Sequence, residues 1–283
     1  MTFLHPLFIL WNPDEVAFHL GPLSVRWYGL CWLIGIVAGL YYMHRMYKDQ
    51  KIDDSLFDTL VVYAFIGILA GARLGHCLLY EPGYYLSSGQ HILEMFLPVS
   101  FDEQGGWHYI GYAGLASHGG MIGITTALWL YSMKAKLPFV KVVDMIGIVG
   151  PLTGTFIRLG NLMNSEIIGR TTDMPWAFVF QQVDTLPRHP GQLYEAIAYF
   201  LTFLTLWLIY RKHKNWIGTG IFIGLTLVMV FTERFCIEFC KEVQVGFENN
   251  MPIDMGQLLS IPFILLGLWF VVRSRKKIRE LEK

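Results

Sequence analysis

The sequence predicts an all-α fold, that of a polytopic membrane protein with about seven transmembrane helices. Hydrophobic residues make up 54% of the 283 residues and charged residues only 16%, whereas a soluble domain usually carries about 25% charged residues. The mean hydropathy of +0.43 agrees with this composition. Aromatic residues make up 15% of the chain, and many lie near the ends of the apolar runs, as in the interfacial belts of membrane proteins.

Seven apolar segments can be counted, and most are long enough to cross a hydrocarbon core of about 30 Å as helices. They cover residues 20–43, 57–79, 117–133, 142–157, 192–210, 217–233 and 257–272. No basic region precedes a short apolar core at the N-terminus, so we expect the first segment to be an uncleaved anchor. The fourth segment is the shortest and leads directly into a polar cluster at Arg158. The fifth is preceded by Pro190, which suits the first turn of a helix.

Basic residues follow alternate segments, which predicts the orientation of the chain. The positive-inside rule makes the links that carry them cytoplasmic, with the N-terminus outside and the C-terminus inside. They are Arg45, Lys48 and Lys51, then Lys134, Lys136 and Lys141, then Arg211, Lys212 and Lys214, and finally Arg273, Arg275, Lys276, Lys277, Arg279 and Lys283. The orientation rule leaves seven cations unexplained, namely Arg26, Arg73, Arg158, Arg170, Arg188, Arg234 and Lys241.

The external links cover residues 81–116, 158–191 and 234–256. We expect them to form a small extracytoplasmic head on a single integral-membrane domain of residues 1–283. The formal net charge is zero, so nothing indicates a nucleic-acid partner. The sequence has no Gly-x-Ser-x-Gly, His-Glu-x-x-His or Walker motif, and it therefore does not indicate a serine hydrolase, a zinc protease or an NTPase.

The polar cluster after the fourth segment is the strongest candidate site. Ionisable residues at membrane depth cost about 3 kcal/mol each on insertion scales, so a cluster kept there indicates a role. Arg158, Asn161, Asn164 and Glu166 follow one another at short spacing. Arginine binds phosphate with two parallel hydrogen bonds, and the asparagines can donate to ester oxygens. The alternative is a structural salt-bridge network that closes the helix end.

Other candidates lie at the same expected depth. His118 opens the third segment with two glycines behind it and can act as a general base or as a structural interfacial histidine. Arg73 lies between Gly71 and Gly75 and can also be an arginine that extends to the interface. The sixth segment ends in Arg234 and Glu238, spaced as an i,i+4 ion pair. The remaining candidates are Tyr28, Gln192, Glu195 and Gln257, for which a purely structural role is as good an explanation as a functional one.

These residues fall into motifs that keep one order along most of the chain. The motifs are Trp27-Tyr28-Gly29, Gly71-Ala72-Arg73-Leu74-Gly75, His118-Gly119-Gly120-Met121-Ile122-Gly123, Arg158-Leu159-Gly160-Asn161 with Asn164, Glu166 and Gly169-Arg170, Arg188-His189-Pro190 with Gln192-Leu193-Tyr194-Glu195, Arg234 with Glu238, and Gly256-Gln257-Leu258-Leu259-Ser260-Ile261-Pro262. Together they closely resemble the bacterial phosphatidylglycerol–prolipoprotein diacylglyceryl transferase family. This chain has Arg26 where many members have His, and Lys241 where they have Arg.

The resemblance implies a transferase of the bacterial cytoplasmic (inner) membrane with its active site towards the outer leaflet. Such an enzyme moves the diacylglyceryl group of phosphatidylglycerol onto the lipobox cysteine of a prolipoprotein signal peptide. A thioether forms and glycerol 1-phosphate leaves. Its partners are these two substrates and the lipid bilayer, and no metal or cofactor is expected.

The candidate residues can be assigned roles in that chemistry. His118 would take the thiol proton, and Arg158 and Arg234 would hold the phosphate and stabilise the leaving group. Tyr28, Asn161 and Glu166 would position the lipid and the arginines. The weaker candidates for substrate binding are Asn164, Arg73, Glu238 and Gln257.

Three alternative functions from other classes of membrane protein stay open at this point. A seven-span transporter would also keep polar residues in the membrane, although usually near the midplane and on broken helices. A heptahelical receptor would share the outside N-terminus, and a lipid-binding membrane protein would need no transferase chemistry.

Overall fold

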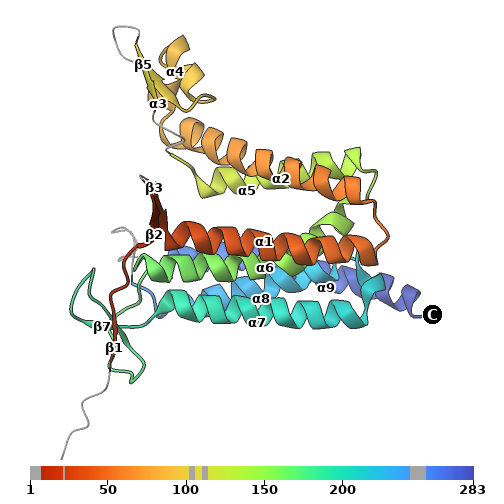
Figure 1. Cartoon of the computed structure of the whole chain (residues 1–283). Helices are drawn as coiled ribbons and strands as arrows, with labels where there is room; N and C mark the ends of the chain where they lie inside the picture. The colour runs from red at the N-terminus through yellow and green to blue at the C-terminus, as the bar shows by residue number, and fades with distance from the viewer. Residues whose placement is uncertain (1–7, 22, 102–105, 110–113, 243–252) are drawn as a thin grey trace, which may run out of the picture. The chain divides into compact units, whose positions relative to one another are not determined.

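The computed structural model describes residues 8–21, 23–101, 106–109, 114–242 and 253–283. These residues form eighteen helices and strands. The chain divides into two compact units (Figure 1). Unit 1 is Met1–Gln50 with Val143–Lys283, and unit 2 is Lys51–Val142.

Unit 1 is built on long helices that lie side by side, with short strands at one end (Figure 1). Its helices are α1 (Trp27–Asp49), most of α6 (Phe139–Met163), α7 (Gly191–Lys212), α8 (Ile221–Glu238) and α9 (Met255–Leu281), with a short 3₁₀ turn η2 (Lys214–Trp216). Its strands are β1 (Ile9–Trp11), β2 (Val16–Leu20), β3 (Leu23–Arg26), β6 (Phe178–Phe180) and β7 (Pro187–Arg188). Strand β6 pairs in parallel with β1 and antiparallel with β7, and β2 pairs with β3 as a hairpin.

Small residues and one carboxylate hold the helices of unit 1 together. Helix α1 approaches α6 closely at Gly35, where the Thr153 hydroxyl donates to the Gly35 carbonyl at 3.1 Å. Asp144 of α6 is fully buried and accepts hydrogen bonds from the backbone N–H groups of Gly218, Gly220 and Ile223 at 2.9–3.0 Å. The Asp144 carboxylate therefore caps the N-terminus of α8, whose first N–H groups have no partner within the helix.

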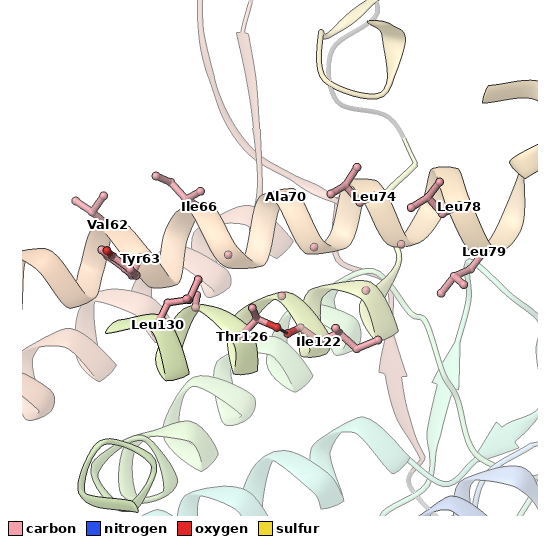
Figure 2. Close-up of a pocket in the computed structure, with 16 residues that line it drawn as sticks. Val62, Tyr63, Ile66, Ala70, Leu74, Leu78, Leu79, Ile122, Thr126 and Leu130 are labelled. Atoms are coloured by element: carbon pink, nitrogen blue, oxygen red, sulfur yellow. Dashed lines mark hydrogen bonds between the residues drawn. The ribbon is translucent and has the colours of Figure 1, made fainter. Parts of the chain in front are cut away.

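Unit 2 contains a pair of tightly packed helices, α2 (Asp54–Gly75) and α5 (Ser117–Lys134). A Cβ at Gly71 would lie 2.5 Å from the Gly119 carbonyl oxygen, so the two backbones are in direct contact. A groove of about 610 Å³ runs along this pair. Apolar side chains from both helices line it, including those of Ile66, Leu74 and Ile122 (Figure 2).

The other elements of unit 2 are short and follow α2. They are the π-helix η1 (His76–Tyr80), α3 (Pro82–Tyr85), α4 (Gly89–Glu94) and the antiparallel pair β4 (Val99–Phe101) and β5 (Trp107–Tyr109).

The fold is mostly helical, in line with the expected all-α class, and it differs in having short strands in the links between helices and in the N-terminal region. The first apolar segment does not start at residue 20, since Leu20 ends β2 and helix α1 begins at Trp27. Gly21 has a φ of 59°, a left-handed conformation that suits the turn of a hairpin. Apolar composition alone does not separate a hairpin strand from a helix start.

Helix ends also differ from the apolar segments. Helix α6 continues to Met163, so Arg158 lies in its last turns and not in a link. Helix α8 likewise continues to Glu238, and α9 continues through the basic tail to Leu281. Hydropathy marks the apolar part of a helix and misses its polar ends.

Four stretches of the described residues are long and apolar enough to cross a membrane as helices, by length and composition. They are Asp54–Tyr80, Phe139–Met163, Gly191–Lys212 and Met255–Leu281. The chain therefore has the character of a multi-pass membrane protein. The count of seven spans and the orientation of the chain stay predictions.

Candidate functional site

A buried ion pair joins Arg158 on α6 to Glu195 on α7. The Arg158 Nε lies 2.9 Å from Oε2 of Glu195, and the Glu195 side chain has no exposed surface. Glu195 lies in the second turn of α7, whose start brings it beside the last turns of α6. The guanidinium is also held by its own helix, because Nη1 donates to Oδ1 of Asn161 at 3.3 Å. Arginine has five N–H donors, so Arg158 keeps donors for an anion.

Two asparagines hold Glu166, which lies just beyond α6. Asn161 Nδ2 donates to one carboxylate oxygen of Glu166 and Asn164 Nδ2 to the other, both at 3.0 Å. The Gln192 side chain, at the start of α7, donates to the Glu166 backbone carbonyl. From the sequence, Glu166 is a candidate for orienting an arginine. In the structure its carboxylate is held by amides, and Glu195 pairs with Arg158 instead.

A second cation shares the Glu195 carboxylate. Lys241 Nζ lies 2.9 Å from Oε1 of Glu195 and 3.1 Å from Oε2 of Glu238. The Glu238 carboxylate lies against Gly256, where a Cβ would come within 2.5 Å of it. Glu195 thus connects α6, α7 and the segment that follows α8.

Arg234 on α8 has a different environment. Its half-buried side chain makes no hydrogen bond or ion pair with another residue in the described part of the chain. The expected Arg234–Glu238 ion pair is therefore wrong, because Glu238 turns to Lys241. The Tyr199 side chain on α7 has both Arg158 and Arg234 among its charged neighbours. Two arginines from neighbouring elements thus approach one tyrosine.

Tyr28 and Gln257 lie beside this cluster with different partners. The Tyr28 ring covers Gly160 of α6, where a Cβ would come within 2.9 Å of the ring. Gln257 is buried, accepts from the Asp254 backbone N–H at 3.2 Å and donates to the Phe235 carbonyl at 3.3 Å. Gln257 thereby caps α9 and ties it to α8.

The other unexplained cations of unit 1 have partners. Arg26 pairs with Glu15 at 3.3 Å on the exposed hairpin, and Arg170 donates to the Lys241 carbonyl at 2.7 Å. The Arg188 guanidinium donates from Nε to Asp184 at 2.9 Å and holds the pKa of that carboxyl below its usual value.

Arg73 and His118 belong to unit 2. Arg73 is buried, donates to the Glu94 carbonyl at 2.7 Å and lies over the Tyr85 ring at 5.2 Å. His118 is exposed, with its Nδ1 3.5 Å from the Tyr80 hydroxyl.

The structure thus brings most of the predicted site residues together at one end of the helices of unit 1. These are Arg158, Asn161, Asn164, Glu166, Arg234 and Glu238, with Tyr28 and Gln257 beside them. Among the described residues no group of three or more metal-ligating side chains could hold a metal ion.

Sequence reasoning missed the importance of Glu195 and did not consider Tyr199. A signal for both exists, because Gln192, Glu195, Tyr199 and Thr202 recur at helical spacing and are all buried on one face of α7. A buried polar stripe on an apolar helix indicates partners on the helices packed against it.

Comparison with known proteins gives a consistent result. The model of the family described as prolipoprotein diacylglyceryl transferase matches residues 15–273. A protein named phosphatidylglycerol–prolipoprotein diacylglyceryl transferase from Bacteroides fragilis is 54% identical over 271 residues, which cover 96% of this chain and 97% of the relative. Proteins of the same name from Tolumonas auensis and Chloroherpeton thalassium are 43% and 41% identical, over 95% and 98% of this chain and 98% and 97% of the relatives.

Proposed function

Because the chain belongs to the prolipoprotein diacylglyceryl transferase family, we propose that it transfers the diacylglyceryl group of phosphatidylglycerol to a prolipoprotein cysteine. The acceptor is the lipobox cysteine of a signal peptide. The thiol sulfur forms a bond to the glyceryl carbon, and the bond from that carbon to the phosphate oxygen breaks. Glycerol 1-phosphate leaves with the electron pair of that bond, and the thiol proton goes to a base.

The environment of Arg234 is the observation that carries this proposal. Six of the seven cations that topology leaves unexplained have a partner in the structure, either a carboxylate or a backbone carbonyl. Arg234 has none within the described residues, and it lies near the same tyrosine as Arg158. A cation with no partner among the described residues, near a second arginine, favours a dianionic or monoanionic phosphate as ligand.

The chemistry gives each residue of the cluster a task. Arg158 and Arg234 bind the phosphate and stabilise the charge that develops on the leaving oxygen, as preorganised electrostatic catalysis requires. Asn161, Asn164 and Glu166 form a rigid amide–carboxylate group beside Arg158 that positions the glycerol. Tyr28 closes the α1 side of the cluster.

The remaining roles rest on the family resemblance. His118 is our candidate for the base that takes the thiol proton, because a free thiol has a pKa near 8.5 and needs activation at neutral pH. Arg73, Glu238 and Gln257 are kept as weaker candidates for substrate binding. The internal contacts of Arg73 and Gln257 support structural roles for these two residues.

We place the enzyme in the bacterial cytoplasmic membrane as one domain of residues 1–283. It has seven spans, the N-terminus outside and the site towards the outer leaflet. Two arguments support this arrangement. The basic residues alternate between links as the positive-inside rule requires. In addition, the polar cluster lies at one end of the unit 1 helices, where α6 and α8 end and α7 and α9 begin.

A reconstituted transfer assay tests the proposal. Vesicles with labelled phosphatidylglycerol receive a lipobox peptide and either wild type, Arg158→Ala or Arg234→Ala. Removal of one charge-stabilising donor typically lowers turnover by about 10²–10³-fold, and we expect losses of at least that size. Arg211→Ala, which removes an exposed arginine near the other end of α7, is the matched control and should keep its activity.

The outcomes of this assay distinguish the possible functions and residue roles. Near-wild-type turnover by both arginine variants of the site would refute the phosphate site. Full activity of His118→Gln would remove its role as base and leave the rest intact. Release of glycerol phosphate only when a thiol acceptor is present supports a transferase. Binding or transport of lipid without such release would favour the non-enzymatic alternatives.

A further inference from the structure

A groove of about 480 Å³ lies between the last turns of α7 and the start of α8. Ligand pockets in proteins usually measure about 300–1,000 Å³, so the groove has the volume of a binding site. The end of α7 lies on the side of unit 1 opposite to its strands (Figure 1). Lys212, which lines the groove, is about 25 Å along α7 from Glu195. The groove is therefore separate from the arginine cluster.

Apolar side chains form the floor of this groove. Leu208 and Ile209 come from α7, and Leu225 comes from α8. The Leu208 side chain is 51% exposed, and residues 191–212 are one of the stretches that are long and apolar enough to cross a membrane. An exposed apolar floor on such a helix suits an acyl chain better than a water-soluble ligand.

Lys212 adds a positive charge to the same groove. Its exposed side chain has no hydrogen bond or ion pair within the described ranges of the chain. The nearby Lys214 differs, because its Nζ pairs with Asp49 at 2.8 Å. A lysine at the end of a membrane span lies at the level of the lipid head groups, so the Lys212 ammonium can meet a lipid phosphate there.

An aromatic pair lines the groove beside Lys212. The rings of His213 and Trp216 are stacked, with their centroids 3.9 Å apart and an interplanar angle of 15°. The indole Nε1 of Trp216 is buried and has no hydrogen-bond partner among the described residues. A buried donor without an acceptor is costly, and a phosphate or ester oxygen of a lipid in the groove would supply the acceptor.

We propose that this groove binds one anionic phospholipid from the leaflet that surrounds the end of α7. Lys212 pairs with the phosphate, the Trp216 indole N–H donates to a phosphate or ester oxygen, and an acyl chain lies on the floor. Leu208 is one helical turn deeper than Lys212, so the groove passes from polar to apolar in the same order as a phospholipid. Basic pockets between membrane helices are known to take anionic head groups.

This lipid is not the substrate of the proposed reaction. In the proposed orientation the end of α7 lies in the inner leaflet, whereas the arginine cluster lies towards the outer leaflet. The inference needs no transferase chemistry, and its test uses no acceptor peptide. A failure of the transfer assay therefore leaves it unaffected.

Fluorescence quenching at Trp216 measures the occupancy of the groove. Full-length protein is reconstituted in phosphatidylcholine bilayers that contain increasing amounts of phosphatidic acid, with bromine, a short-range quencher, near the glycerol end of its acyl chains. The signal of Trp216 is the difference between each protein and the same protein with Trp216→Phe, which keeps an aromatic ring. We expect phosphatidic acid to quench this signal at lower mole fractions than phosphatidylcholine brominated at the same position.

Lys212→Gln and Arg211→Gln form a matched pair, because each removes one exposed positive charge and only Lys212 lines the groove. Both are measured in about 1 M salt, where the Debye length is about 3 Å and general attraction to the bilayer is screened. Loss of one hydrogen bond to a charged group corresponds to about a tenfold change in affinity. We therefore expect Lys212→Gln to weaken the preference for phosphatidic acid by about tenfold and Arg211→Gln by less than about twofold.

Four outcomes would overturn the proposal. Equal losses in Lys212→Gln and Arg211→Gln would indicate attraction by surface charge alone. Equal quenching by the two brominated lipids would make the groove an ordinary lipid-facing surface. Relief of the quenching by inorganic phosphate would indicate a site for a free anion, and absence of quenching by either lipid would show that another part of a protein covers the groove.

Discussion

Replacement of Glu195 by glutamine should destabilise the protein and inactivate it, although only one buried carboxylate oxygen is replaced by an amide nitrogen. The side chain keeps its volume, but its negative charge disappears between Arg158 and Lys241, each of which lies 2.9 Å from a carboxylate oxygen. Removal of one partner from a buried ion pair usually costs about 3–5 kcal/mol, because the other charge stays buried and uncompensated.

The remaining contacts of the two cations determine where in that range the loss of stability should fall. Lys241 retains Glu238 at 3.1 Å, whereas Arg158 retains only the neutral Asn161 among its described side-chain partners. One cation rather than two loses its counterion, so we expect the lower end, about 3 kcal/mol. At about 2 °C per kcal/mol for a chain of this size, the unfolding temperature should fall by about 6 °C.

Thermal unfolding in detergent, followed by the fluorescence of the nine tryptophans, measures this shift, and the transfer assay measures activity on the same samples. The matched control is Glu15→Gln, which removes a carboxylate from an arginine that is well exposed. Glu15 pairs with Arg26 at 3.3 Å with 44% of its side chain exposed, and exposed pairs contribute at most about 1 kcal/mol. If Glu195→Gln unfolds within a degree of the control and retains its turnover, the buried network does not hold the site.

Three further substitutions test contacts away from Glu195. Asp144→Ala removes the cap of α8 and should cost about 2 kcal/mol in thermal unfolding. It should leave turnover unchanged, because residue 144 lies about 20 Å along α6 from Arg158; an inactive, fully stable variant would contradict this assignment. Gly123→Val should separate α2 from α5, since a Cβ at residue 123 would lie 2.1 Å from the Gly67 carbonyl oxygen, and its expression as stable protein at wild-type level would refute the close packing. Because Arg188 lowers the pKa of Asp184, this carboxylate stabilises the fold at neutral pH and the contribution is lost as the pH falls below about 4. Asp184→Asn should therefore lose less thermal stability between pH 5 and pH 3 than wild type does, and identical acid profiles would show that the pair contributes nothing.

The helices of the protein could be predicted because an apolar run is a strong signal, and the four candidate spans overlap the predicted segments. Their ends could not, because the polar last turns of α6 and α8 have the composition of a link although they remain helical. The hairpin before α1 was missed for the opposite reason. Its residues are apolar, and a strand of five residues leaves no periodicity that separates it from a helix.

Much of the candidate site could be predicted from residue type alone. Arg158, Asn161 and Glu166 are close in sequence, so a helix end necessarily brings them together. Their partner Glu195 could not be identified in this way, since it comes from a different helix and pairing across helices depends on how α6 and α7 pack. The Arg234–Glu238 pair was predicted wrongly because i,i+4 spacing permits an ion pair but does not exclude a closer competitor, here Lys241.

The strand β1 has a consequence for the order in which the protein is assembled during synthesis. Ile9 pairs with Phe178, and the Trp11 indole donates to the Leu162 carbonyl at 2.9 Å, a separation of 151 residues along the chain. The ribosome must therefore synthesise α1, α2, α5 and α6 before the first strand of the protein can find its partner. Contacts this distant in sequence form slowly, so the end of unit 1 that carries Arg158 is among the last parts to close. A newly made chain can thus insert its helices while its site is still incomplete.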